Sequence, residues 1–236
     1  MKLEVIGFNI ESCTIAQNAG AFRIELCDNE AEGGTTPSLG FIKAARAILS
    51  IKLYPIIRPR GGDFLYSNAE FEMMKTDIEC CKNEDCDGVV IGILNRDGSV
   101  DKQRCQQLVE LAYPMGVTFH RAFDRTNDSA KALEDIVEIG CERILTSGQA
   151  PTALAGTSLI KVLIQQANDR IVIMPGSGIR SNNIKEIAET TGAKEFHTSA
   201  KMYTNSKMNF MNPAMAENLQ HLITNEDEII KMIENF

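Results

Sequence analysis

The sequence predicts a single (β/α)8 barrel, the TIM-barrel class of α/β proteins, as one domain over residues 1–236. Short apolar or alternating runs recur along the chain, and segments with apolar residues at three- and four-residue intervals lie between them. Eight strand–helix units in 236 residues match the usual size of this barrel. A doubly wound open sheet also alternates strands and helices, but it rarely needs eight regular units. No G-x-G-x-x-G follows the first run either.

Eight strands are expected where apolar residues alternate with polar ones or form a short continuous run. In chain order these runs are LEVIGF (3–8), FRIELC (22–27), YPIIRP (54–59), GVVIGIL (88–94), VTFHRAF (117–123), ERILTS (142–147), IVIMPG (171–176) and EFHTSA (195–200).

Helices are expected between the strands, where the apolar spacing changes to the helical period. They are SCTIAQNAG (12–20), LGFIKAARAIL (39–49), NAEFEMMKTDIECC (68–81), KQRCQQLVELAY (102–113), SAKALEDIVEIG (129–140), LIKVLIQQA (159–167), SNNIKEIAETTG (181–192) and EDEIIKMIENF (226–236). Gly20, Gly140 and Gly192 stand where a glycine cap would end three of them. The polar segment TNSKMNFMNP (204–213) opens a C-terminal tail and helix, 204–236.

Charge and cysteine content exclude several classes of protein. The formal charge of −8 predicts no nucleic-acid partner. The chain begins with a strand-like run that lacks signal-peptide features, and no apolar run approaches the ~20 residues that span a bilayer. We therefore expect a cytoplasmic protein with no membrane partner. The seven cysteines lack C-x-x-C spacing and are expected to be free thiols.

A barrel places its functional site at the C-terminal ends of the strands. By this rule Cys27 is the one cysteine at the end of a strand, whereas CCKNEDC (80–86) is interpreted as packing thiols. Alternation along the strands selects the side chains that face the upper barrel. These are Arg23, Glu25 and Cys27; Arg58 and Arg60; His120 and Asp124; and Glu195, His197 and Ser199. The alternative is a buried polar plug whose groups satisfy one another.

These side chains favour a ligand with negative charge. Arg58 and Arg60 have the planar fork that grips a carboxylate or phosphate. Glu25 and Asp124 are suited to orienting a histidine or to acting as acid or base, with His120 as a further acid–base group. The residue chemistry therefore allows an enzyme with Glu25, His120 and Asp124 as catalytic candidates.

The loops after the last three strands add further candidates. Ser147 lies in TSGQ (146–149), after the sixth strand. Gly176, Ser177 and Gly178 precede a predicted helix start with Ser181 as its N-cap, so their backbone N–H groups are candidates for an anion cradle. An ordinary tight turn is the alternative for this loop.

Eight motifs resemble one family in order and spacing. RIELC, EGGTTPSLG, IIRPRGGDFLYS, DGVVIGIL, VTFHRAFD, RILTSGQ, MPGSGI and EFHTSA are similar to the CutC family, named for copper homeostasis, from about residue 2 to residue 203. The resemblance implies a cytoplasmic barrel, commonly oligomeric, that is associated with copper tolerance and proposed to bind Cu(I). Its recurrent polar positions correspond to Glu25, Cys27, Arg58, Arg60, Asp63, His120, Arg121, Asp124, Ser147 and His197.

Two positions depart from the family pattern. Ile6 stands where members often have a cysteine in the first strand, and Met211 stands where a later loop tends to have an arginine. A two-thiolate copper site is therefore not available. Cu(I) prefers thiolate, thioether and imidazole ligands, so Cys27 and His120 are the candidate metal ligands, with His197 as the alternative imidazole and Met174 as a further sulfur ligand. The neighbouring arginines oppose a bound cation.

The sequence thus supports two functions. The first is copper homeostasis of CutC type, with Cu(I) as the bound ion. The alternative is an enzyme that acts by acid–base chemistry on a small phosphorylated or carboxylated metabolite. For that enzyme, Arg58, Arg60, Ser147, His197 and residues 176–178 would hold the ligand. The resemblance and the apolar terminal segment IIKMIENF (229–236) also predict a homo-oligomer.

Overall fold

The expected barrel is confirmed by the structure, a computed structural model in which residues 1–235 are described. Its strands are β1 (Lys2–Gly7), β2 (Arg23–Leu26), β3 (Lys52–Pro55), β4 (Gly88–Ile91), β5 (Gly116–Phe119), β6 (Arg143–Thr146), β7 (Val172–Pro175) and β8 (Glu195–Thr198). Its helices are α1 (Ile10–Asn18), α2 (Leu39–Ile48), α3 (Asn68–Asn83), α4 (Lys102–Ala112), α5 (Ser129–Glu138), α6 (Thr157–Ala167), α7 (Ile184–Thr191) and α8 (Glu226–Glu234).

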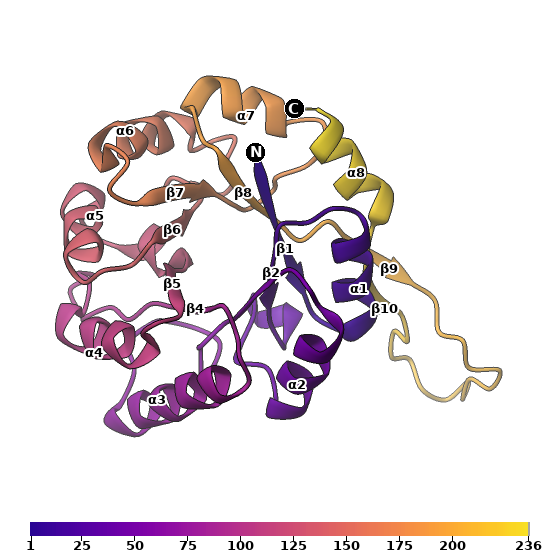
Figure 1. The fold of residues 1–236 in the computed structure, drawn as a ribbon. Coiled ribbons are helices and arrows are strands. Elements are labelled where there is room, and N and C mark those ends of the chain that lie inside the picture. Colours follow the sequence, from indigo (N-terminus) through magenta and orange to yellow (C-terminus); the bar gives the residue numbers. More distant parts are fainter. Residues whose placement is uncertain (236) are drawn as a thin grey trace.

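The strands form a closed parallel ring with the helices outside it (Figure 1). The hydrogen-bonded orders are β3-β2-β1-β8 and β4-β5-β6-β7. A parallel bridge between Ile56 and Val90 joins the third and fourth strands, and β7 lies beside β8. In the pairing of β8 with β1, Glu4 stands opposite His197, and in the pairing of β1 with β2 it stands opposite Arg23. Closure therefore brings the first, second and eighth strands together around Glu4.

Local sequence signals explain where the helices begin and end. Asn9 caps α1 by accepting a hydrogen bond from the Ser12 N–H, and Ser67 and Glu70 form a reciprocal capping box at α3. The three glycines expected at helix ends have φ of 93° at Gly20, 89° at Gly140 and 79° at Gly192. Their role in ending helices is confirmed, because L-residues with a Cβ rarely adopt this conformation.

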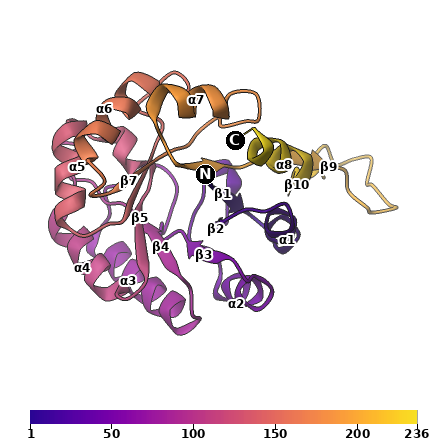
Figure 2. The ribbon, with the colours of Figure 1, turned by 45° about the horizontal axis from the view of Figure 1, so that its top comes forward.

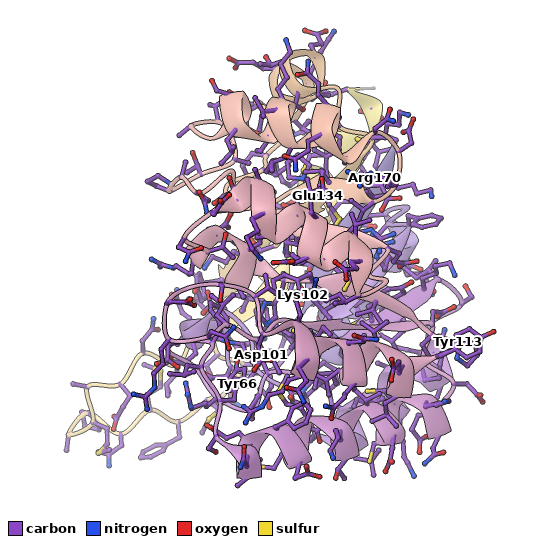
Figure 3. All side chains as sticks on the ribbon, turned by 90° about the vertical axis from the view of Figure 1, so that its left-hand side faces the viewer. Tyr66, Asp101, Lys102, Tyr113, Glu134 and Arg170 are labelled. Carbon is purple, nitrogen blue, oxygen red and sulfur yellow. The ribbon has the colours of Figure 1, made fainter. Side chains whose placement is uncertain are left out.

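Ion pairs link charged side chains of the outer layer, and Figure 3 labels Lys102, Glu134 and Arg170 among them. Arg170 pairs with Glu134 of α5 at 2.7 Å, and Lys102 of α4 pairs with Asp135 at 3.2 Å. Beneath them, aliphatic side chains fill the space between helices and strands. Within the described chain, no helix is both long enough and apolar enough to cross a bilayer.

The C-terminal tail contains a hairpin that the sequence analysis did not predict. Strands β9 (Lys201–Thr204) and β10 (His221–Thr224) pair antiparallel, and the loop between them projects away from the barrel (Figures 1 and 2). The polar segment 204–213 forms part of this projecting loop. Helix α8 then returns to pack beside α1. A helix was expected over 226–236, of which Phe236 lies outside the described residues.

All eight strands end one to four residues before the runs that predict them, and the difference changes the site in two cases. The third ends at Pro55, so Arg58 and Arg60 lie in the following loop. The fifth ends at Phe119, and a 3₁₀ helix, η2 (Arg121–Arg125), follows. The expectation that alternation continues to Asp124 is therefore wrong. The cause is local, because the His120 imidazole accepts the Ala122 N–H at 3.1 Å and caps the 3₁₀ turn.

Candidate functional site

A cavity of about 790 Å³ opens at the C-terminal ends of the strands. Its lining contains six of the polar residues singled out from the sequence or from the family resemblance: Glu25, Arg58, His120, Arg121, Asp124 and His197. Ile6, Ile56, Phe64 and Leu145 supply apolar walls. This combination of apolar walls and a few converging polar groups is typical of a small-molecule site.

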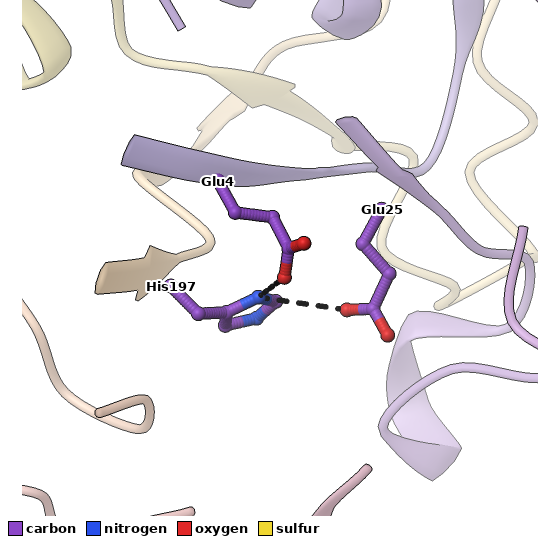
Figure 4. A group of neighbouring side chains, drawn as sticks. All are labelled: Glu4, Glu25 and His197. Atoms are coloured by element: carbon purple, nitrogen blue, oxygen red, sulfur yellow. Dashed lines mark hydrogen bonds and ion pairs between the residues drawn. The ribbon is translucent and has the colours of Figure 1, made fainter. Parts of the chain in front are cut away.

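Glu4, Glu25 and His197 form the most closely connected group at this site (Figure 4). His197 Nδ1 lies 2.8 Å from a Glu4 carboxylate oxygen and 3.6 Å from Glu25 Oε2. All three residues are buried. Because the Glu4 carboxylate accepts the Nδ1 proton, the imidazole is oriented and its Nε2 is left for another partner. The result is a carboxylate–imidazole pair with a second carboxyl group beside it.

The two carboxyl groups have opposite pKa shifts. Burial raises the pKa of Glu25 to about 7, although the nearby charge of His197 lowers it in part. Burial alone would also raise the pKa of Glu4, but the positive charge of Arg23 and the hydrogen bond from His197 bring it down to about 2. Glu4 is therefore a fixed anion, whereas Glu25 titrates near neutral pH.

His197 is shifted toward its protonated form. Burial alone would lower the pKa of His197, but the hydrogen bond to Glu4 and the negative charge of Glu25 outweigh burial and raise it. Glu25 and His197 are therefore adjacent groups whose pKa values are both raised. Such a pair is suited to general acid–base chemistry.

A buried ionic network supports this group from below. Arg23 donates to Glu4 and, at 2.9 Å, to Glu195; Arg143 donates to the same Glu195 oxygen at 2.8 Å. Arg143 also donates to Thr118 at 3.0 Å. The alternative of a satisfied polar plug therefore describes the lower lumen correctly. It does not describe the cavity above, where buried polar atoms lack partners.

Sequence reasoning did not select Glu4. Its signal was alternation in the first strand, where Val5 packs outward into the aliphatic core and Glu4 faces the lumen. What the sequence did not reveal was the register with β8, which places His197 opposite Glu4 across 193 positions.

Arg58 and Arg60, in the loop after β3, have different surroundings. The buried Arg58 lines the cavity and donates to the carbonyl oxygens of Glu32, Gly34 and Gly62. Arg60 points elsewhere: it donates to Glu70 at 2.6 Å and to Asp63 at 2.9 Å, and it is absent from the cavity lining. The structure therefore places only Arg58 where it can meet a ligand.

His120 is buried in the cavity wall as a neutral imidazole. Burial and the positive charge of Arg58 lower the pKa of His120 to about 3. Gly92 permits the ring to lie there, since a Cβ on that glycine would approach the ring to 2.4 Å. Phe64 packs on it with ring centroids 4.9 Å apart. His120 is thus a rigid hydrogen-bond donor at neutral pH.

Asp124 and Ser147 hold a loop together. The Asp124 carboxylate accepts from Thr146 Oγ1 and from the main-chain N–H groups of Ser147 and Gln149, and it pairs with Arg121 at 2.7 Å. These bonds occupy its lone pairs. Ser147 is itself fully buried and bonded to the Ala150 carbonyl. Both residues therefore position the cavity wall.

The loop 176–178 does not reach the cavity lining. Ser181 is not the helix cap that was expected, because α7 begins at Ile184 and the Ser181 N–H and hydroxyl both donate to the Glu228 carboxylate. A carboxylate from α8 therefore takes both donors of Ser181. Ser177 has a φ of 81° and donates to the Pro151 carbonyl, as in a tight turn.

Cys27 is fully buried beside the apolar cavity wall, in a cluster with Ile6 and Ile56. Gly34 closes over it, since a Cβ at that glycine would lie 3.2 Å from the sulfur. Burial and the negative charges of Glu25 and Glu4 raise the pKa of the Cys27 thiol well above its ordinary value. A thiolate, the form that binds Cu(I), is therefore disfavoured here.

The donor set offers a poor fit to a copper ion. Glu4, Glu25 and His197 bring one ligand atom each to within 4.8 Å of one another, the one such cluster among the described residues. Both Glu4 oxygens, however, already bond to His197 and Arg23. Two carboxylates and one imidazole also lack the soft sulfur that Cu(I) prefers.

Comparison with known proteins identifies the family. The model of the CutC family matches residues 1–202. The chain belongs to the CutC family. A CutC family protein of Parabacteroides distasonis is 51% identical over 211 residues, covering 89% of this chain and 87% of the relative. The human protein named Copper homeostasis protein cutC homolog is 48% identical over 214 residues, covering 91% of this chain and 78% of the relative.

Solved structures agree with this assignment. The CutC structure from Streptococcus agalactiae superposes with a TM-score of 0.81 at 35% identity, over 84% of this chain and 98% of that chain. An aldolase, QR15, superposes with a TM-score of 0.63 at 15% identity, over 84% of this chain and 89% of that chain. The second likeness supports the barrel class alone.

Proposed function

We propose that this CutC protein binds a small, negatively charged metabolite in the upper cavity and acts on it by acid–base chemistry. The observation that carries the proposal is Glu25, a buried carboxyl group on the cavity with its pKa raised to about 7. A general base works best when its pKa lies near the working pH. Glu4 and Glu195 each bond directly to a buried arginine, whereas Glu25 has only the longer contact of 3.6 Å with the His197 imidazole.

Each group has a role in this proposal. Glu25 takes or returns a proton of the ligand. His197, oriented by Glu4, presents Nε2 as the second acid or base, in the manner of a carboxylate–histidine pair. Arg58 supplies the positive charge that attracts the anion.

A ligand screen tests the proposal. Thermal shift with a panel of phosphorylated and carboxylated metabolites is expected to find anions that raise the melting temperature. Affinity measured from pH 5 to 9 should then change around pH 7 in the wild type, and the change should become smaller in Glu25→Gln, where His197 alone still exchanges a proton. Glu186→Gln, on the exposed side of α7, is the matched control. Failure of every anion to bind at millimolar concentration would refute the proposal.

Copper handling is the second candidate. It is supported by the name of the human and mouse relatives, Copper homeostasis protein cutC homolog, at 48% and 49% identity. Cys27 and His120 would be the ligands of Cu(I), with the loop at Gly34 opening to admit the ion. The seven free cysteines suit a reducing compartment, and we propose the cytoplasm as the place of action.

A competition titration of the reduced protein with Cu(I) against a chromophoric chelator tests the copper proposal. Tight one-to-one binding that is lost in Cys27→Ala and weakened in His120→Ala would support it. Binding that is absent, or unchanged in both variants, would remove copper from this site.

A further inference from the structure

Arg58 is a buried cation without an anionic partner. It is 6% exposed, its Nη1 and Nη2 atoms bond to main-chain carbonyl oxygens, and its guanidinium lies 5.2 Å from the centre of the Phe64 ring. Among the described residues no ion pair includes Arg58, and its buried Nε has no hydrogen-bond partner. The other two buried arginines, Arg23 and Arg143, are both paired with carboxylates. A buried charge is costly unless it is compensated, and no anion compensates the charge of Arg58.

His120 presents a second unsatisfied donor. Its Nδ1 accepts the Ala122 N–H, which places the ring proton on Nε2. That Nε2 is buried and has no partner among the described residues. The side chain is 3% exposed, and its ring is held by Phe64 and by contact with Gly92. A rigid N–H of this kind is a pre-positioned donor toward a ligand oxygen.

Arg58, His120 and Glu25 line one cavity, and the unpartnered Arg58 Nε and His120 Nε2 atoms are buried in its wall. We propose that Arg58 and His120 form an oxyanion subsite, which takes a planar oxygen anion such as a carboxylate or the enolate oxygen of a carbonyl compound. This inference rests on the proposed function and names the substrate class that the cavity accepts. A neutral imidazole beside an arginine suits an oxygen that carries or gains negative charge, because the imidazole donates without adding a second cation.

The oxyanion has two possible sources. In the first, it is a carboxylate that the ligand already carries. In the second, Glu25 removes a proton from the carbon next to a carbonyl group; the C–H electron pair becomes the C=C bond, and the carbonyl π pair moves to oxygen. Arg58 and His120 then hold that oxygen, and Glu25 returns the proton. No oxidant, reductant or further reactant is needed for this exchange.

Calorimetric titration with oxalate, a planar dianion, tests the subsite. Arg58→Met and His120→Leu are each expected to weaken oxalate binding by roughly 10- to 100-fold, the effect of losing one hydrogen bond to a charged group. His120→Gln, which keeps an N–H donor, should retain most of the affinity. Arg60→Met and His221→Leu are the matched controls, because both side chains lie outside the cavity lining.

A measurement on the wild-type protein tests the subsite without any variant that could fail to fold. In protein labelled with ¹⁵N at histidine, oxalate should shift the His120 Nε2 resonance while Nδ1 keeps its bond to the main chain. Unchanged Nε2 resonance and unchanged affinity in Arg58→Met and His120→Leu would overturn the subsite. The proposed function would survive that result if an anion still bound with Glu25-dependent pH behaviour, whereas absence of any anion binding would refute both.

Solvent deuterium exchange distinguishes the two sources. Pyruvate incubated with the protein in D₂O should lose its methyl proton signal, and Glu25→Gln should abolish that loss, if the subsite stabilises an enolate. Oxalate binding that depends on Arg58 and His120, without exchange of pyruvate, supports the subsite and assigns it to a carboxylate of the bound ligand.

Discussion

Replacing Glu25 by glutamine should change how the stability of the protein depends on pH. The folded state holds the Glu25 proton up to a pKa of about 7, whereas the unfolded chain releases it near the ordinary value of 4.5. Folded protein therefore binds more protons between these two values, and the wild type loses stability as pH rises through that window. A tenfold change in proton affinity is worth about 1.4 kcal/mol, so ionised Glu25 costs the folded state about 3 kcal/mol above pH 7.

Glutamine has nearly the same shape and no charge at any pH. The Glu25→Gln variant should therefore match the wild type near pH 4.5 and exceed its free energy of unfolding by about 3 kcal/mol at pH 8. Urea denaturation at half-unit pH steps measures this difference. For Glu186→Gln, exposed on α7, the difference from the wild type in free energy of unfolding should be the same at every pH. A flat difference for Glu25→Gln as well would refute the assignment of a raised pKa.

Four further outcomes follow from the structure. Glu4→Gln should cost roughly 1.5–3 kcal/mol in urea denaturation, because Arg23 loses one of its two carboxylate partners and His197 loses the charge that holds it; wild-type stability would contradict the network. Gly92→Ala should cost roughly 1–3 kcal/mol and weaken anion binding in calorimetry, because its Cβ would lie 2.4 Å from the His120 ring; unchanged affinity would show that the ring position is unimportant. A thiol reagent should label Cys80 alone in the native protein and all seven cysteines after unfolding; rapid native labelling of a second thiol would contradict the burial of the others. Replacing loop 205–220, with its exposed methionines and phenylalanine, by a short Gly-Ser turn should reduce the mass seen by light scattering from oligomer to monomer; a wild-type protein that is already monomeric would remove the predicted oligomer.

The barrel could be predicted because each strand–helix unit has its own local sequence signals. Apolar spacing changed from alternation to the helical period at nearly every boundary, and glycines marked three helix ends. The prediction failed where a strand ends and a side chain redirects the main chain. At His120 the imidazole captures a nearby N–H and begins a 3₁₀ turn, so alternation no longer applies to Asp124.

The candidate site could be predicted only in part, for a related reason. Glu25, Arg58, His120 and His197 lie on the cavity as strand-end positions should. The partners of these residues depend on strand register and on barrel closure, which join positions far apart in sequence. Glu4 is the clearest case: its contact with His197 spans 193 positions.

Arg60 and Ser181 show the opposite problem, since each has the expected chemistry in the expected segment. Arg60 turns toward Asp63 and Glu70, and Ser181 is bound by Glu228 from the C-terminal helix. These carboxylates accept from the same donor groups that a ligand would use. Sequence patterns do not indicate which acceptor those donors bond to in the folded protein. The tail hairpin was missed because each of its strands, KMYT and HLIT, has only four residues, too few to show a clear alternation.

A crystal structure of the protein grown with oxalate tests the central claim most directly, that the upper cavity is an anion site with Arg58 and His120 as its donors. The account predicts an oxalate oxygen within about 3.2 Å of His120 Nε2, in contact with the Arg58 guanidinium and beside Glu25. An empty cavity at saturating oxalate, or oxalate bound only at Arg60 or the loop 176–178, would contradict it.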